Sequence, residues 1–92
     1  VMGYCYQTAR IVNNATQWYS GDVVDYPTIW KLTLMNYNAG PDCVYNAVRA
    51  AFLRTNGPVN WDDIRAQVSG YQCVRGMTYA NQITAKYYDF PP

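Results

Sequence analysis

The sequence predicts an all-α domain of about five short helices. Apolar residues recur at three- and four-residue spacing in several segments, and this is the period of an amphipathic helix. No segment alternates apolar and polar residues for long enough to indicate a strand. Breaking signals such as Gly40-Pro41 and Asn56-Gly57-Pro58 separate the periodic segments. The chain has 92 residues, so we expect 1–92 to form one small domain, or part of a larger one.

The first helix is expected over residues 4–19. Its apolar stripe consists of Tyr4, Thr8, Ile11, Ala15 and Trp18. Ser20-Gly21-Asp22 ends this helix, and a short linker leads to Asp25, which is suited to cap the next one.

The second helix should begin near Pro27 and end at Gly40. It is apolar on nearly every side, so we expect it to be buried at the centre of the fold. The apolar residues are Ile29, Trp30, Leu32, Leu34, Met35 and Tyr37. Asn36 and Asn38 flank Tyr37 at its end. Polar groups in so apolar a setting need partners, so these amides are either satisfied inside the fold or face a ligand cleft.

Three further helices are expected at 41–54, 61–68 and 75–88, the second of them capped by Asn60. Their core stripes are Val44, Ala47, Val48, Ala51 and Phe52, then Trp61, Ile64 and Val68, then Met77, Ala80, Ile83 and Tyr87. The tryptophans at 18, 30 and 61 are all expected in the core.

Composition argues against several classes of function. The net charge is +1 with no basic run, so nucleic acid is not an expected partner. No apolar run approaches the roughly 20 residues that a membrane span needs. Histidine is absent and the cysteines are far apart, so neither a metal site nor a cofactor is predicted. Ten tyrosines without a basic stripe favour a sugar-binding or packing surface.

The three cysteines leave two alternatives open, either buried free thiols or a disulfide in an exported protein. The Tyr-, Asn- and Thr-rich, Lys-poor composition favours export, to the periplasm or the cell exterior. We take Cys43 and Cys73 as the candidate pair. The odd count leaves Cys5 as a candidate link to an upstream segment or another chain. Because the chain begins at Val1, we expect a processed or truncated product.

The tetrad Tyr37-Asn38-Ala39-Gly40, preceded by an apolar helix and followed by Pro41, resembles the lytic transglycosylases and goose-type lysozymes of the lysozyme-like superfamily. These lytic transglycosylases cut the glycan strands of bacterial peptidoglycan. The order of the remaining elements is similar too, including Trp61-Asp62-Asp63-Ile64 and Thr78-Tyr79. The resemblance covers most of the chain and implies the C-terminal part of a lysozyme-like catalytic domain.

By the same resemblance, Tyr37 places its hydroxyl near the catalytic carboxyl and Asn38 hydrogen-bonds the N-acetyl or hydroxyl groups of the sugar. Tyr79 lines the floor of the cleft. The structural alternative for Tyr37 and Asn38 is a buried hydrogen-bonded pair that ties two helices together. For Tyr79 it is ordinary helix packing.

The family's chemistry rests on an upstream glutamic acid, followed by a Gly-Leu-Met-Gln-like stretch, and this chain contains neither. Asp42, Asp62 and Asp63 lie in first turns of helices, where the dipole favours the ionised carboxylate rather than a general acid. We therefore expect no catalytic residue in this chain. It would contribute the sugar-binding wall of a peptidoglycan-cleaving enzyme, completed by a missing N-terminal segment or another copy. The alternative is a non-catalytic extracellular protein that binds glycan or assembles with itself.

Overall fold

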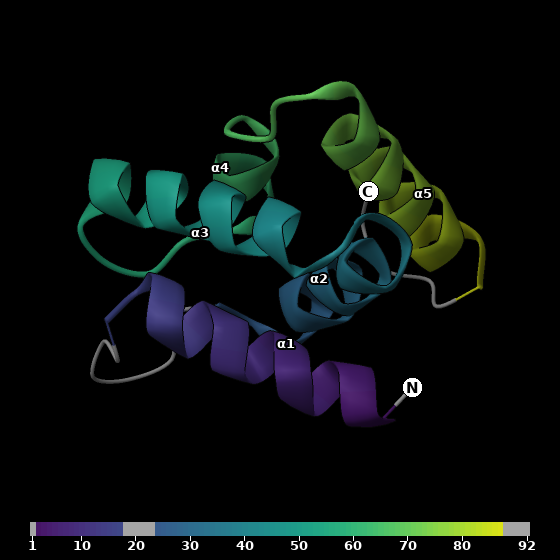
Figure 1. Ribbon diagram of the computed structural model, residues 1–92, viewed down its shortest axis with the longest axis horizontal. Helices are drawn as coiled ribbons and strands as arrows, with labels where there is room; N and C mark the ends of the chain where they lie inside the picture. Colours follow the sequence, from purple (N-terminus) through teal and green to yellow (C-terminus); the bar gives the residue numbers. More distant parts are fainter. Residues whose placement is uncertain (1, 18–23, 88–92) are drawn as a thin grey trace.

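The computed structural model describes residues 2–17 and 24–87, with side chains described over 6–17 and 24–83. These residues form five α-helices and no strand, which confirms the all-α prediction (Figure 1). The helices are α1 (Met2–Ala15), α2 (Tyr26–Ala39), α3 (Pro41–Thr55), α4 (Trp61–Arg65) and α5 (Tyr71–Tyr87). None of them is both long enough and apolar enough to cross a membrane.

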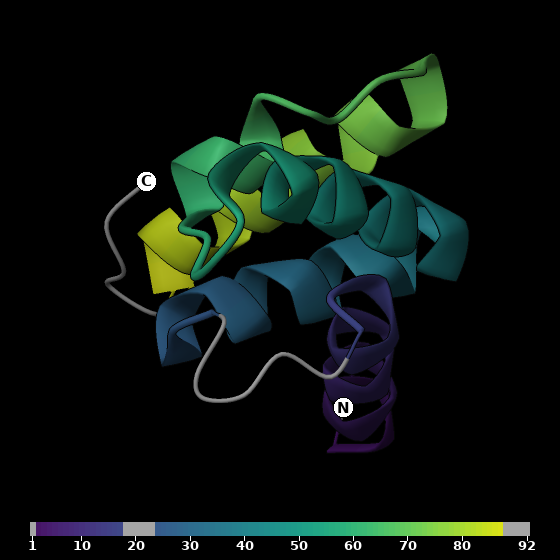
Figure 2. The same ribbon diagram turned by 90° about the vertical axis from the view of Figure 1, so that its left-hand side faces the viewer.

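Helix α2 lies at the centre and packs against α1, α3 and α5. Its most extensive contact is with α5, while α1 also packs on α3 and the short α4 packs on α3. Figure 2 shows α2 running across the molecule, with α3 above it and α1 nearly perpendicular to it. The central position predicted for the second helix is therefore confirmed.

Both ends of α2 are set by local signals that the sequence carries. The Asp25 carboxylate accepts a hydrogen bond from the Thr28 N–H at 2.9 Å, as an N-cap should, and Pro27 occupies the first turn. At the other end, Gly40 has φ of 99° and donates its N–H to the Asn36 carbonyl at 2.9 Å. A residue with a side chain is strained at this φ, so glycine permits the turn into α3.

Helix α4 begins with a reciprocal capping box. The Asn60 side-chain oxygen accepts from the Asp63 N–H at 2.8 Å, and the Asp63 carboxylate accepts from the Asn60 N–H at 3.1 Å. Asn60 is therefore the cap that the sequence indicates. The box also holds Asp63 in a fixed place beside the chain that leads into α4.

Three predicted helix boundaries are wrong. The first helix ends at Ala15 instead of residue 19, because Gln17 adopts a left-handed conformation with φ of 54°. The fourth ends at Arg65 instead of Val68, where the chain turns away after a single helical turn. The fifth begins at Tyr71 instead of residue 75, immediately after Gly70. Residues 18, 19 and 88 lie outside the described part.

All five helices and the segment before α4 contribute to the core. Its buried apolar residues are Val12, Ala15, Leu32, Met35, Cys43, Val44, Ala47, Val48, Ala51, Val59, Trp61, Ile64 and Ala80. The stripe predicted for α3 is confirmed, with Phe52 half-buried at its end. Trp61 is buried as expected, Trp30 is only half-buried, and Trp18 lies outside the described residues.

The prediction that α2 is buried on nearly every side is wrong. Of its six apolar residues, only Leu32 and Met35 are buried, and Tyr37 is 66% exposed. Four polar residues of α2 are buried instead, namely Thr28, Lys31, Thr33 and Asn36. The reason is geometric: α1, α3 and α5 pack on one side of α2, and the opposite side stays open among the described residues.

Helix α5 is held against α2 and α3 by two features. A Cβ added at Gly76 would lie 2.5 Å from the Ala39 Cβ, so glycine allows the two backbones to approach closely. One turn earlier, a disulfide joins Cys73 to Cys43 near the start of α3. This is the candidate pair, so these two cysteines are not free thiols. The side chain of Cys5 lies outside the described residues.

Candidate functional site

The tetrad lies at the C-terminal end of α2, and its first two side chains point outward. Tyr37 is 66% exposed and Asn38 is exposed as well. The alternative in which they form a buried pair tying two helices together is therefore wrong. A tyrosine side chain and a side-chain amide therefore lie at the surface at this end of the helix.

The buried polar link that the alternative required is made by the preceding residue. Asn36 is 3% exposed and donates its amide to the Gln7 Oε1 at 2.9 Å and to the Thr8 Oγ1 at 3.3 Å. These bonds tie α1 to α2, while the Asn36 Oδ1 has no partner among the described atoms. Of the two amides, Asn36 is buried and bonded inside the fold through its nitrogen alone, and Asn38 faces outward.

Tyr79 lies on α5, one turn beyond the point where Gly76 meets Ala39. It is 41% exposed, so full burial by helix packing does not account for it. Its proposed contact with sugar stays a prediction. What the fold provides is a rigid support, because α5 is fixed against the same end of α2 that carries Tyr37.

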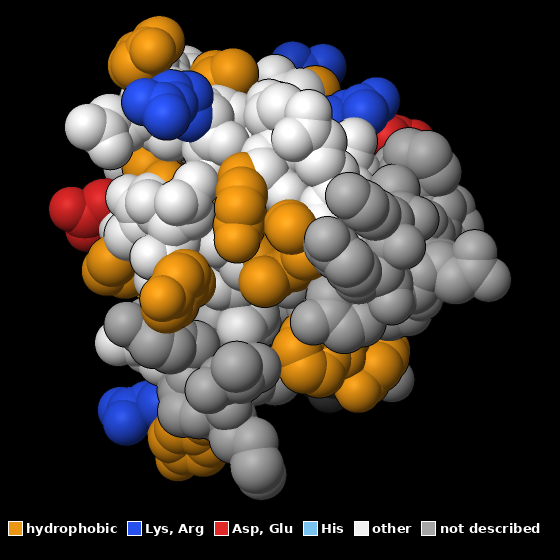
Figure 3. All heavy atoms as spheres, turned by 90° about the vertical axis from the view of Figure 1, so that its right-hand side faces the viewer, with side chains coloured by type: hydrophobic (Ala, Val, Ile, Leu, Met, Phe, Trp, Pro, Cys, Tyr) orange, Lys and Arg blue, Asp and Glu red, His pale blue; other side chains and the backbone are white. Residues whose placement is uncertain are grey.

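A stripe of apolar side chains runs along the open side of α2 from Tyr37 back to the first turn. The stripe consists of Tyr26 and Tyr37, which are exposed, and of Trp30 and Leu34, which are half-buried, Leu34 against the core. Tyr26 is 66% exposed, and its ring meets the Trp30 ring edge-on with centroids 6.1 Å apart. Figure 3 shows hydrophobic side chains across the middle of the face where α5 lies, with charged side chains towards its edges.

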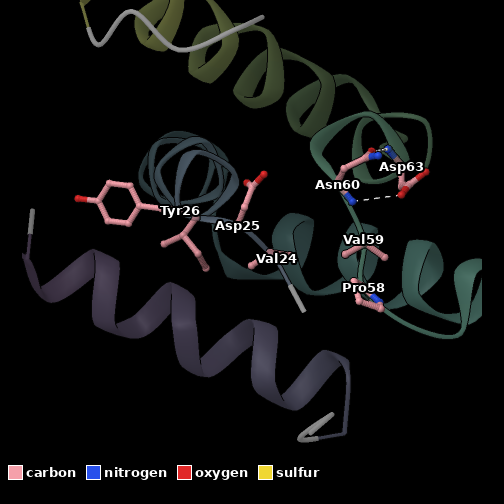
Figure 4. Close-up of a pocket in the computed structure, with 8 residues that line it drawn as sticks. Val24, Asp25, Tyr26, Pro58, Val59, Asn60 and Asp63 are labelled. Atoms are coloured by element: carbon pink, nitrogen blue, oxygen red, sulfur yellow. Dashed lines mark hydrogen bonds between the residues drawn. The ribbon is translucent and has the colours of Figure 1, made fainter. Parts of the chain in front are cut away.

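A groove of about 740 Å³ adjoins the N-terminal end of this stripe. Asp25 and Tyr26 border it on one side, and Val59, Asn60 and Asp63 border it on the other. Figure 4 shows Asp25 across the groove from the hydrogen-bonded pair of Asn60 and Asp63, with Val59 on the segment that leads into that pair and the Tyr26 ring directed away from it. The groove thus combines apolar walls with fixed polar groups. Sequence patterns did not predict it, because its two sides come from distant segments.

Lys31 is a buried cation that the sequence analysis missed. Its side chain is 3% exposed, and its ammonium lies 5.4 Å from the centroid of the Trp61 ring, a cation–π geometry. Burial lowers the pKa of Lys31, opposed by the nearby carboxylates of Asp62 and Asp25. Spacing is the sequence signal that indicates the burial of Lys31, because Lys31 falls on the same helix face as Thr28 and Met35.

The described aspartates cap helices, pair with arginine or lie exposed at the surface. Asp25 and Asp63 cap helices, and exposed Asp62 pairs with Arg65 at 3.3 Å. Asp42 is exposed in the first turn of α3. None of these carboxyls sits in the desolvated pocket that a general acid of a glycosidase requires. Asp22 and Asp89 lie outside the described residues.

Comparison of the chain with protein-family models, with curated proteins and with solved structures gives no match.

Proposed function

We propose that this chain forms the glycan-binding wall of a peptidoglycan-cleaving domain of the lytic transglycosylase type. The proposal is carried by one observation, the outward placement of Tyr37 and Asn38 at the end of α2 beside the buried Asn36. It is also supported by the resemblance of the tetrad to that family. Secretion, with a disulfide that suits an oxidising compartment, belongs to the same proposal.

The two exposed side chains supply complementary contacts to an N-acetylated sugar. The Tyr37 ring offers an apolar face against which a sugar ring packs, and its hydroxyl donates or accepts at the edge. The Asn38 amide donates to and accepts from hydroxyl and N-acetyl groups. Both residues sit within a turn of Gly40, and the buried side of α2 fixes their direction. They bind and orient the glycan, while the acid for cleavage would come from outside this chain.

Binding to insoluble peptidoglycan tests the proposal. The chain provides a matched control, because Tyr45-Asn46-Ala47 on α3 repeats Tyr37-Asn38-Ala39, with Tyr45 37% exposed and Asn46 exposed. We expect the double variant Tyr37→Ala/Asn38→Ala to weaken cosedimentation with purified peptidoglycan by about tenfold or more, the loss of one stacked ring and its neighbouring polar contacts. Tyr45→Ala/Asn46→Ala should leave binding unchanged. Equal effects of the two double variants would refute the proposal.

Self-assembly is the second candidate function, and exposed side chains favour it. Eight large hydrophobic residues are exposed in the described part, and six of them are tyrosines. They lie on α1, α2, α3 and α5, so more than one face is available for contact between copies. Sedimentation velocity over a range of concentrations distinguishes self-assembly from glycan binding by a monomer. Regular oligomers together with no affinity for peptidoglycan would replace the glycan proposal with a structural role.

A further inference from the structure

We propose that Gly76 on α5 is a positioning residue for the glycan-binding end of α2. Its close contact with Ala39 sets the direction in which Tyr37 and Asn38 project. This inference rests on the proposed function and deepens it, because it names a residue that acts on that site without touching the ligand. The contact lies two residues from Tyr37 on α2 and three residues from Tyr79 on α5, so it also sets the spacing between the two segments that carry these tyrosines.

Gly76 is buried in the interior of α5, where glycine is an unfavourable residue. Only proline is a poorer helix former at an interior position, so a glycine there needs a reason in packing. A Cβ built at Gly76 would lie 2.5 Å from the Ala39 Cβ, much closer than the roughly 3.5 to 4 Å at which carbon atoms pack. Because the Ala39 Cβ is fixed to its own backbone, no side-chain rotation can relieve this contact.

The atoms that face Gly76 belong to the last turn of α2. Besides the Ala39 Cβ, the same added Cβ would lie 3.5 Å from both the Ala39 backbone nitrogen and the Met35 carbonyl oxygen. Met35 and Ala39 are one turn apart, and Tyr37 and Asn38 lie between them. Both of these side chains are exposed, so the backbone of this turn decides where they point. A shift of Ala39 is therefore passed on to both.

Helix α5 cannot simply move away from α2 to make room for a side chain at this position. One turn before Gly76, the disulfide joins Cys73 to Cys43, which lies four residues after Ala39, and the two Cα atoms are 5.4 Å apart. The contact of α5 with α2 is also the most extensive between described helices. Ala39 and Gly40 are only half-buried, and the helix ends there. A side chain at 76 would therefore displace the last turn of α2.

Exchanging the two residues across the contact tests this role. Gly76→Ala should weaken cosedimentation with purified peptidoglycan by about fivefold, part of the loss expected for Tyr37→Ala/Asn38→Ala. Ala39→Gly leaves a gap instead of a clash and should weaken binding by about twofold. In the swapped variant, Ala39→Gly/Gly76→Ala, the added Cβ meets the backbone nitrogen at 39 and the Met35 carbonyl oxygen at 3.5 Å, an ordinary contact. Binding by the swapped variant should return to the wild-type value.

A matched control separates positioning from loss of stability. Val48 on α3 is 0% exposed, so Val48→Ala destabilises the core without adding an atom against α2, and it should leave binding unchanged. Circular dichroism confirms that each variant is folded. Backbone amide NMR without glycan provides a second readout, in which Gly76→Ala shifts the amides of Tyr37 and Asn38, the swapped variant restores them and Val48→Ala does not move them. If Gly76→Ala does not fold, the swapped variant should still bind more tightly than Ala39→Gly.

The other outcomes overturn the inference in distinct ways. If folded Gly76→Ala binds as the wild type does while Tyr37→Ala/Asn38→Ala does not, the inference is refuted and the proposed function stands. The inference is also refuted if the swapped variant binds no better than the single variants, or if Val48→Ala loses as much binding as Gly76→Ala. In those cases Gly76 acts on stability alone. If the wild-type chain does not sediment with peptidoglycan, the proposed function fails and the inference fails with it.

Discussion

Helices α2 and α3 are consecutive and of almost equal length, 14 and 15 residues, yet they use their faces in opposite ways. Helix α3 buries an aliphatic stripe of valine and alanine, as an amphipathic helix does. Helix α2 buries Thr28, Lys31, Thr33 and Asn36 beside Leu32 and Met35, and exposes two tyrosines. Helix α3 exposes Tyr45 and Leu53, but its buried face is aliphatic throughout, and the contrast suits the proposed function, in which α2 contributes the glycan-binding residues.

The repeated Tyr-Asn-Ala tripeptide makes the same point at the level of residues. It occurs at 37–39 and again at 45–47, with its tyrosine and asparagine on the surface both times. At 37–39 it follows an aromatic stripe and precedes the Gly40 turn, whereas at 45–47 it lies inside a regular helix. Under the proposed function, the neighbours of the tripeptide, and not its residue types alone, distinguish 37–39 from 45–47.

The largest expected effect concerns the disulfide that anchors α3 to α5. The Cys43–Cys73 disulfide joins α3 to α5 across 30 residues of sequence. Replacing both cysteines by alanine should lower the free energy of unfolding by roughly 3 to 4 kcal/mol, mainly because the unfolded chain gains freedom. Urea denaturation measures the loss. A change below about 1 kcal/mol would show that packing on α2, rather than this bond, fixes α5.

Two leucines allow the buried face and the open side of α2 to be compared by the same substitution. Leu32 is fully buried and Leu34 is half-buried on the open side. Leu32→Ala should cost about 3 kcal/mol of unfolding free energy through lost burial and a cavity, and Leu34→Ala about 1 kcal/mol or less. Equal losses would mean that the open side is covered and would break the comparison.

A matched pair of amides tests the polar part of the buried face. Asn36→Ala removes two hydrogen bonds from α2 to α1 and should cost about 1 to 2 kcal/mol of unfolding free energy. Asn38→Ala, on the exposed side, should cost less than about 0.5 kcal/mol. The same urea titration serves both variants. A larger loss for Asn38 would contradict its placement at the surface.

Lys31 gives the smallest effect, and it appears only as a dependence on pH. The folded chain lowers the pKa of Lys31 below its unfolded value of 10.5, so the unfolded state binds more protons between those two values. Stability contributed by this group should therefore rise with pH across that window, by no more than about 1.4 kcal/mol per pH unit. Lys31→Met should lack this rise. If wild type and variant show parallel pH profiles up to 10.5, the burial of the cation is contradicted.

Periodicity and capping signals were enough to predict the helix count and most of the boundaries. Asp25, Gly40 and Asn60 act locally, and the stripe of α3 follows from spacing alone. The predicted end of the first helix was wrong because Gln17 adopts a left-handed conformation, which a sequence normally signals by glycine. The predicted start of α5 was wrong because the first turn of the helix lacks an acidic residue that would mark it. The disulfide of α5 depends on a partner that is distant in the sequence.

The site was predicted only in part, for a related reason. The exposure of Tyr37 and Asn38 followed from the resemblance, but the rest of the open side did not. Because α2 is rich in apolar residues, its pattern indicates burial all round, and only the positions of α1, α3 and α5 decide which side is covered. The surroundings of Lys31 depend on Trp61, and the groove depends on Asn60. Both of these residues lie about thirty residues further along the chain, beyond the reach of a local pattern.

Backbone amide NMR during titration with N-acetylglucosamine hexasaccharide tests the central claim, that the C-terminal end of α2 binds glycan. The account predicts shifts at Tyr37 and Asn38. Amides at 45 and 46 on α3 should not move. Shifts confined to α3, or no shifts at concentrations where peptidoglycan binds, would contradict the account.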